Sequence, residues 1–325
     1  MALPQLAQLL LLFLGASVSS SSTTSSLFDT LPLPPALPLP PPAWGISTLR
    51  QRRSGAPGPP PRVDELDEGV MELFTINGAA ALESYYVDDS REGQGSHYRY
   101  SAAMIDPMVD RARELRAGLA AGGAAARRAM RSLKKHAPIF EALEVHSIKG
   151  KDVAVVGSME PWWEAVCVAF GAKSVTTIEY NALDYADTGN VIATTTPAAW
   201  LAAPIAFDAV LSISSIDHDG LGRYNDPLAP DGDLLSMWWT QSAMVKRTAE
   251  AFLLMTVPIG PDTVAWNLHR RYGKVRLPLL LRGWDVRAKY GWSDARLDAP
   301  APYYKSYEPV FVLGVAAEEG GSREL

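Results

Sequence analysis

The sequence predicts an α/β fold with a mostly parallel sheet, and four apolar runs support this. A short β-rich run at 153–156 ends at Gly157, a helix-compatible stretch follows, and a second run at 174–178 ends on Glu179. This order of strand, turn, helix and strand is that of a βαβ unit. Similar runs at 207–213 and 252–257 add two more strands to the same predicted sheet.

The first βαβ unit predicts a binding site for a nucleoside cofactor. Its right-handed crossover places the turn after the first strand and the end of the second strand at one edge of the sheet. Gly157 allows the backbone to approach a ligand, and the following helix N-terminus offers unpaired N–H groups. Glu179 lies where a carboxylate accepts two hydrogen bonds from a ribose diol. The candidate cofactor contacts are Gly157, Ser158, Glu160, Pro161, Trp162, Glu179, Tyr180, Asn181 and Ser215.

Each of these assignments has a structural alternative. Ser158 can be a turn former, Glu160 a carboxylate that favours the helix start, and Glu179 a solvated acid at a strand end. Pro161 suits the first helical turn in either case.

Composition and charge narrow the class of protein. An apolar fraction of 47% and a charged fraction of 20% are those of a globular protein. A net charge of −6 argues against a dedicated nucleic-acid surface, which would carry a basic stripe. Cys167 is the single cysteine, which excludes an internal disulfide, and its place in the crossover helix favours a buried thiol over a nucleophile.

The N-terminal part of the chain is predicted to lie outside the fold. Residues 1–20 contain an apolar run of signal-peptide length, too short to span a bilayer comfortably. Residues 21–62 are rich in Ser and Pro and predict an extended stem, or a disordered leader that acts only as a spacer. We therefore expect a location in the ER or Golgi lumen or outside the cell. A plastid or other organelle is the alternative, because no basic residue precedes the apolar run.

A helical extension is expected at 63–145, before a catalytic domain at 146–318 and a tail at 319–325. Its long Ala-rich region at 102–143 is broken at Gly122 and Gly123. Five basic residues recur there at helical spacing: Arg127, Arg128, Arg131, Lys134 and Lys135. They predict either a solvated helix face or a binding site for an anionic partner.

The segment after the predicted strand at 207–213 predicts the catalytic residues. This strand ends in Ser214 and Ser215 and is followed by a polar cluster aimed at the cofactor cleft. His218 is the expected general base, with Asp217 or Asp219 to orient it; the alternative is a histidine that only braces the loop. The catalytic candidates are His218, Asp219 and Arg223, and the substrate-binding candidates are Asp217, Tyr224, His269 and Arg270.

Other roles are open for several residues in this loop. Arg223 can instead pair with Asp226 or Asp231, and Asp233 is expected to cap the N-terminus of a helix that starts at Leu234. Together with His218, the aspartates of this loop could supply ligands for Mg²⁺ or Mn²⁺. These five are Asp217, Asp219, Asp226, Asp231 and Asp233. Their spacing matches no metal motif, so no metal site is assigned.

Several motifs in this sequence are similar to known families. The glycine turn, the acidic end of the second strand and FDAV running into a histidine resemble class I S-adenosylmethionine-dependent methyltransferases. More specifically, residues 139–316 resemble a family known as a Caenorhabditis-type domain of unknown function. The resemblance is carried by the stretches VVGSMEPWWEA, TTIEYN, SSIDHDGLGRYNDPLAPDGDL and WNLHRRYG. The resemblance implies a Rossmann-like sheet with an antiparallel last strand and S-adenosylmethionine as cofactor. It implies no established reaction, substrate or catalytic residue.

The first motif departs from the usual methyltransferase pattern, in which an acidic residue precedes a G-x-G-x-G turn. Here a single glycine is followed by Ser158, Met159 and Glu160, and Glu160 could replace the missing acid. The leading hypothesis is an O-methyltransferase with a glycan or glycoconjugate acceptor in the secretory pathway. The alternatives are a non-catalytic Rossmann-like module that binds a glycan or a protein, and a nucleotide-sugar or dinucleotide enzyme.

Overall fold

A seven-stranded sheet forms the centre of the computed structural model, which describes residues 59–91, 96–189, 191–224, 226–302 and 304–315. The strand order is β11-β12-β8-β7-β3-β4-β6. The five strands from β8 to β6 are parallel, whereas β12 is antiparallel to both of its neighbours. The strands are β3 (Asp152–Val156), β4 (Ser174–Ile178), β6 (Ile192–Thr195), β7 (Ala209–Ile213), β8 (Phe252–Thr256), β11 (Trp284–Tyr290) and β12 (Val310–Val315).

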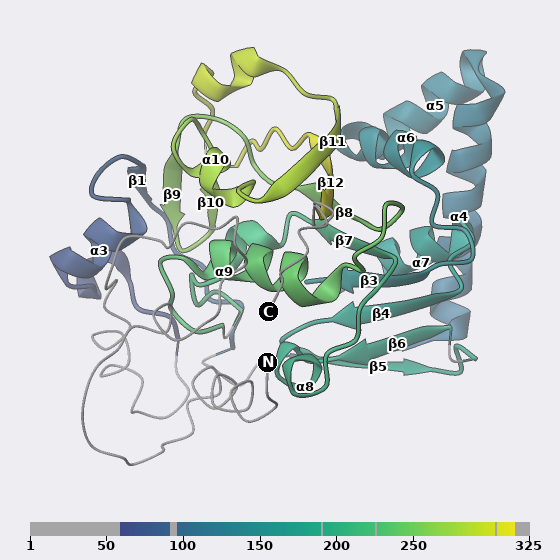
Figure 1. The fold of residues 1–325 in the computed structure, drawn as a ribbon, viewed down its shortest axis with the longest axis horizontal. Helices are drawn as coiled ribbons and strands as arrows, with labels where there is room; N and C mark the ends of the chain where they lie inside the picture. Colours follow the sequence, from purple (N-terminus) through teal and green to yellow (C-terminus); the bar gives the residue numbers. More distant parts are fainter. Residues whose placement is uncertain (1–58, 92–95, 190, 225, 303, 316–325) are drawn as a thin grey trace, which may run out of the picture.

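Helices cover both faces of this sheet, as its buried and apolar strands require. Side chains alternate along β3, so that Val153 and Val155 pack against one helical layer and Ala154 against the other. The first layer contains α4 (Ala102–Ala121), α5 (Gly123–Leu133), α6 (Ala137–Val145) and α7 (Trp162–Ala169). The second contains α8 (Pro197–Ala202), α9 (Gly232–Trp239) and α10 (Arg276–Leu280), and Figure 1 shows α7 and α9 on opposite sides of the strands.

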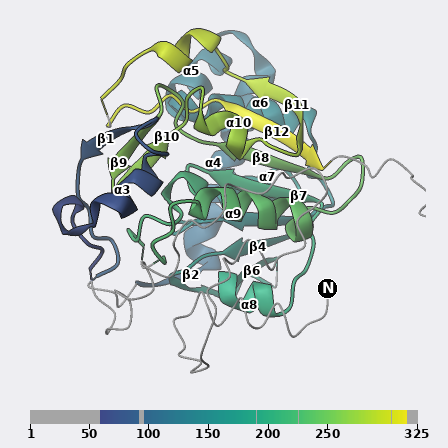
Figure 2. The same ribbon diagram turned by 60° about the vertical axis from the view of Figure 1, so that its left-hand side comes forward.

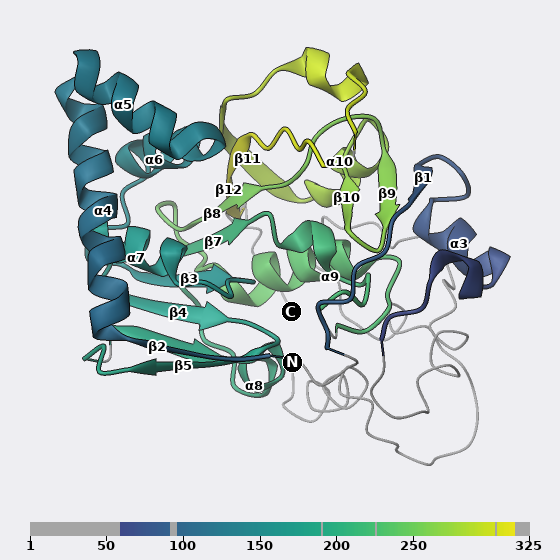
Figure 3. The same cartoon turned by 180° about the vertical axis from the view of Figure 1, so that it is seen from behind.

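The N-terminal extension is joined to the central domain through two small sheets. β1 (Ala81–Ser84) pairs in parallel with β9 (Thr263–Trp266), which also pairs with β10 (His269–Arg271). With α3 (Glu68–Phe74), these strands gather at one side of the molecule (Figure 2). β2 (His97–Ser101) lies alongside β5 (Ala182–Ala186) and leads into α4 (Figure 3).

The remaining elements are single turns of helix: η1 (Val63–Glu65), η2 (Lys134–His136), η3 (Ile216–His218), η4 (Thr240–Met244) and η5 (Asp294–Asp298). Within the described part of the chain, no helix is both long enough and apolar enough to cross a membrane.

The structure confirms the predicted fold class, including the antiparallel strand near the edge of the sheet. The predicted N-cap was wrong: α9 begins at Gly232, and the Asp233 carboxylate is buried in a bidentate contact with Arg276 at 2.5 and 2.8 Å. A buried guanidinium competes for this carboxylate more strongly than a backbone N–H does. The leader and most of the stem lie outside the described residues, which begin at residue 59.

Candidate functional site

The turn after β3 brings the ends of three strands together. Gly157 has φ +71, and its N–H donates to the carbonyl of Ile178 at the end of β4 (2.9 Å). A β-carbon at residue 157 would overlap Oγ of Ser215, which follows β7. Only glycine satisfies both conditions, and the Gly157 backbone stays exposed at this edge of the sheet.

Ser158 connects this turn to a buried carboxyl group on α7. Its Oγ lies 2.9 Å from the carbonyl of Glu160 and 3.0 Å from Oε2 of Glu164. The hydroxyl of Thr177 donates to Oε1 of Glu164 at 2.7 Å. Burial raises the pKa of Glu164 to about 7, against hydrogen bonds that favour ionisation. A protonated Glu164 donates to Ser158, which then donates to Glu160, so every hydrogen in this network has an acceptor.

The residues at the start of α7 differ in exposure. Glu160 is exposed, Pro161 is the N-cap residue, and Trp162 begins the helix half-buried. Trp162 packs edge-on against Trp163, with ring centroids 6.4 Å apart. The Glu160 side chain is therefore accessible to a ligand at this turn, whereas the Trp162 side chain is partly buried against the core.

Glu179 lies at the end of β4 as predicted, but its carboxylate has internal partners. Oε1 accepts from both the backbone N–H and the side-chain amide of Asn181, each at 2.9 Å. Asn181 in turn accepts from the N–H of Ser96 at 2.8 Å, and Tyr180 beside it is 40% exposed. Burial raises the pKa of Glu179, and the Asn181 bonds oppose this shift.

His218 ends η3, and a carbonyl fixes its tautomer. Its Nδ1 lies 2.5 Å from the carbonyl oxygen of Leu268. Because a carbonyl only accepts, Nδ1 carries the hydrogen and Nε2 carries the lone pair. Burial, together with the positive charge of Arg223, lowers the pKa of His218 to about 4. His218 is therefore a neutral, weak base at pH 7.

Asp217 lies beside this imidazole without a hydrogen-bonded partner. Its Oδ2 is 3.6 Å from Nε2 of His218, beyond hydrogen-bond distance. The carboxyl is fully buried, and neither oxygen has a hydrogen-bond partner among the described residues. Burial raises its pKa well above the usual range, and the charge of Glu308 adds to this shift. A buried, unpaired polar group of this kind suits a ligand that brings its own donors.

Three other predicted residues lie around His218. Tyr224 meets its ring edge-on at 5.5 Å, and the His269 ring lies 6.3 Å away with a buried Nε2 that has no partner in the described structure. Burial lowers the pKa of His269 to about 3. Arg223 does not pair with Asp226 or Asp231: its Nε donates to Asp89 of the extension at 2.7 Å, and Nη1 donates to Leu268 at 3.3 Å.

The structure places two predicted residues away from this group. The Asp219 carboxyl accepts from Ser236 at 2.5 Å and does not contact His218. Arg270 is fully buried and donates to the carbonyls of Asp219 (2.5 Å), Ala229 (3.2 Å) and Pro230 (3.2 Å). Both side chains brace the loop from inside.

The remaining aspartates also hold the loop. Asp226 accepts from the N–H groups of Gly220, Gly222 and Tyr224 at 2.8 to 3.1 Å. No group of three or more His, Cys, Asp or Glu side chains suited to a metal ion occurs in the ranges that the structure describes.

Sequence reasoning missed Glu164 and Glu308. Glu164 had a signal, because it is the single charged residue in the apolar helix WWEAVCVA. Glu308 had none: it is buried before β12, and its partner Lys135 (3.0 Å) is 173 residues away in the sequence.

This sheet, with its covering helices and the site at the carboxyl ends of its strands, is the Rossmann-like fold of class I methyltransferases. Residues 150–300 match the profile of a family described as "Caenorhabditis protein of unknown function, DUF268". The match confirms the resemblance that the motifs predicted. Among curated proteins, no significant match to the chain was found.

Solved structures give only distant similarity. A SAM-dependent methyltransferase from Leishmania major is 11% identical with a TM-score of 0.37, covering 64% of this chain and 85% of its own. An S-adenosylmethionine-dependent methyltransferase from Mesorhizobium loti is 12% identical with a TM-score of 0.33, covering 55% and 97%. A ribosomal protein L11 methylase from Lactobacillus delbrueckii subsp. bulgaricus is 11% identical with a TM-score of 0.32, covering 55% and 79%.

Proposed function

We propose that this protein is an S-adenosylmethionine-dependent O-methyltransferase. The observation that carries the proposal is the apposition of Gly157 and Ser215 at the edge of the sheet where Glu179 ends β4. A backbone without a β-carbon is exposed there, beside a helix start and an acidic strand end. These are features that a nucleoside cofactor uses.

The cofactor would be held by the turn and by the end of β4. Backbone groups at Gly157 and Ser158 would contact its amino-acid part, and Glu160 would face its ammonium group. Glu179 would accept hydrogen bonds from the ribose once its oxygens turn from Asn181. When bound, S-adenosylmethionine supplies a methyl group on a positively charged sulfur.

His218 would act on the acceptor hydroxyl. Its Nε2 lone pair would take the proton of that hydroxyl while the bound cofactor would supply the methyl group that the oxygen accepts. The Leu268 carbonyl accepts from Nδ1–H and so stabilises the imidazolium that results. With a pKa of about 4, His218 suits a transfer in which the proton leaves together with methyl arrival, not ahead of it.

We also propose that the acceptor is a glycan or glycoconjugate and that the protein acts in the secretory pathway. Both proposals rest on the signal-like apolar run at residues 6–16. Fusing residues 1–62 to a reporter tests the location. A reporter in the lumen supports it, and a plastid or cytosolic reporter contradicts it.

One observation favours a non-catalytic relative as the second candidate. The Glu179 carboxylate is buried and already bonded to Asn181, as in a site that has lost its ligand.

Calorimetric titration with S-adenosylhomocysteine, NAD and a UDP-sugar distinguishes the methyltransferase from a non-catalytic relative and from a nucleotide-sugar or dinucleotide enzyme. The proposal expects binding of S-adenosylhomocysteine alone, weakened by about 1.5–3 kcal/mol in Glu179→Gln, the size of lost hydrogen bonds to a charged group. Asp184→Asn, at a half-buried acid of β5 that pairs with Arg99 (3.1 Å), should bind as wild type. No binding by the folded protein would contradict the proposal, and preferred binding of NAD or the UDP-sugar would replace it.

A further inference from the structure

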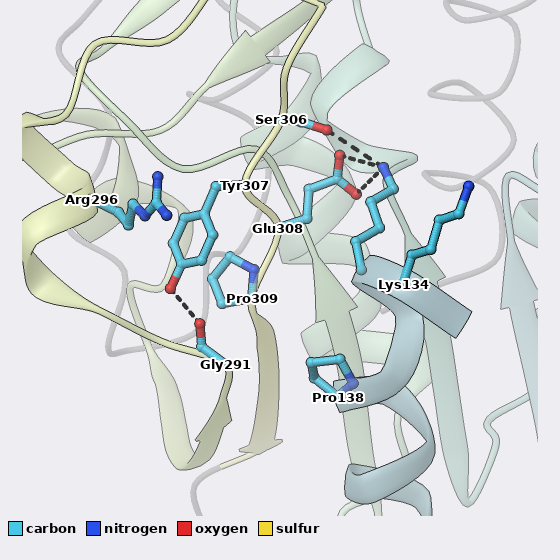
Figure 4. Close-up of a pocket in the computed structure, with 9 residues that line it drawn as sticks. Lys134, Pro138, Gly291, Arg296, Ser306, Tyr307, Glu308 and Pro309 are labelled. Atoms are coloured by element: carbon cyan, nitrogen blue, oxygen red, sulfur yellow. Dashed lines mark hydrogen bonds and ion pairs between the residues drawn. The ribbon is translucent and has the colours of Figure 1, made fainter. Parts of the chain in front are cut away.

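A cavity lies at the carboxyl edge of the sheet, between η2 and the segment that leads from β11 to β12 (Figure 4). Its volume is about 290 Å³. Lys134, Lys135, Arg296, Tyr307 and Glu308 contribute its polar groups. The cavity is near the lower end of the size range of ligand pockets, which suits one small chemical unit.

The side chains that line this cavity carry a net positive charge, although the whole chain has a net charge of −6. Three cationic side chains line it against one carboxylate, that of Glu308. Lys135 donates to both oxygens of Glu308 at 3.0 and 3.1 Å, which leaves the charges of Lys134 and Arg296 unbalanced. No carboxylate pairs with either of them in the described ranges, and Figure 4 shows them on opposite sides of Glu308.

The two cations are held differently. The Arg296 guanidinium lies over the Tyr307 ring, 5.0 Å from its centroid, while the Tyr307 hydroxyl donates to the carbonyl of Gly291. Lys134 has φ +52 and ψ −118, a conformation that costs free energy for a residue with a β-carbon. Strained backbone of this kind clusters at ligand sites.

The cavity and the proposed catalytic group lie at the same edge of the sheet. Val310, two residues after Glu308, pairs with Thr256, whose carbonyl accepts from the N–H of Ser214 (3.0 Å), ahead of Asp217 and His218. The carboxyl of Glu308 is buried, and its charge raises the pKa of Asp217 and opposes the lowering at His218 and His269. A molecule in the cavity would therefore lie at the same edge of the sheet as the side chains proposed to deprotonate an acceptor.

We propose that this cavity holds the anionic group of the methyl acceptor, a carboxylate or a phosphate on a sugar-sized unit. The inference rests on the proposed function. Lys134 and Arg296 bind the anion from two sides, and Lys135 stays with Glu308. The exposed basic residues Arg127, Arg128 and Arg131 on α5 precede the cavity in the chain and favour the approach of a negatively charged molecule.

The test is a titration with glucuronate, glucose 6-phosphate and uncharged glucose, each with and without S-adenosylhomocysteine. We expect at least one anionic sugar to bind more than 10-fold tighter than glucose, with an affinity that falls as salt increases. The double variant Lys134→Gln/Arg296→Gln should lose that preference, and Arg113→Gln, at an exposed position on α4, should keep it. Thermal melting confirms that the variants fold.

The two anionic sugars distinguish a carboxylate from a phosphate. Equal binding of charged and neutral sugars, no binding of any of them, or unchanged binding by the double variant would overturn the inference. Failure of S-adenosylhomocysteine to bind, with the anion preference intact, would overturn the proposed function and leave the anion site in place.

Discussion

The backbone of Gly157 and the hydroxyl of Ser215 lie so close that a β-carbon on residue 157 would overlap Ser215 Oγ. The two residues follow β3 and β7, which are neighbours in the sheet. Their contact therefore fixes how closely the β7 loop approaches the turn where the cofactor is proposed to bind.

Replacing Gly157 by alanine should destabilise the protein and abolish binding of S-adenosylhomocysteine. Gly150→Ala is the matched control, because Gly150 has nearly the same φ (+72) with nothing within 4 Å of the added carbon. Both variants carry the cost of a positive φ, about 1–2 kcal/mol. Chemical denaturation should show a larger loss for Gly157→Ala, and equal losses would mean that the Ser215 contact has no consequence.

Glu164 should make stability fall as pH rises. Its pKa is about 7 when folded against an ordinary 4.5, so between these values the folded state keeps a proton that the unfolded state has lost. The stability lost across this window is on the order of 3 kcal/mol. Glu164→Gln should remove most of that decline in denaturation experiments at pH 5 and pH 8. Glu141→Gln, at an exposed helix position, should follow wild type, and an unchanged slope in Glu164→Gln would refute the assignment.

His218→Ala should lower turnover by roughly 10²- to 10⁴-fold and leave the affinity for S-adenosylhomocysteine near wild type. Because the neutral imidazole is the base, the wild-type rate should fall only as pH drops toward the pKa of about 4. His97→Ala, at an exposed position on β2, is the control. A joint loss of stability and acceptor affinity would instead show that His218 braces the loop, and sensitivity to a chelator would indicate a metal.

A chain that starts at residue 59 should fold cooperatively, because it keeps the hydrogen bonds that the carbonyls of Pro60 and Pro61 accept. The carbonyls of Pro60 and Pro61 accept from the Tyr86 hydroxyl (2.8 Å) and from Nε1 of Trp266 (3.0 Å). A chain that starts at residue 63 loses both acceptors, and each donor left without a partner costs about 1–3 kcal/mol. Thermal melting of the two truncated chains measures the difference, and equal stability would show that water replaces both carbonyls.

The strands of the central sheet could be predicted because their signals are local. The runs that became β3, β4, β7 and β8 are apolar and β-rich, and they stop at Gly157, Glu179, Ser214 and Pro258 respectively. Gly157 and Glu179 could be placed for the same reason, since a βαβ crossover brings its two strand ends to one edge.

The partners of the site residues could not be predicted, because they come from distant parts of the chain. Arg223 pairs with Asp89 across 134 residues, and Glu308 with Lys135 across 173. Asp233 carried a helix-start pattern, yet Arg276 on α10 takes its carboxylate. Patterns within a segment say which residues are polar and near an edge, but tertiary packing decides which of them remain available to a ligand.

The parallel pairing of β1 with β9 has a consequence for biosynthesis. Val87, just after β1, donates to Asn267, just after β9, and these residues are 180 positions apart. During translation the N-terminal extension leaves the ribosome long before its pairing partner exists. The strand edge of β1 therefore stays without its partner β9 until most of the central sheet has been synthesised. The pairing of β1 with β9 is therefore a late step in the folding of the nascent chain. A chaperone that shields residues 81–87 would act before that step.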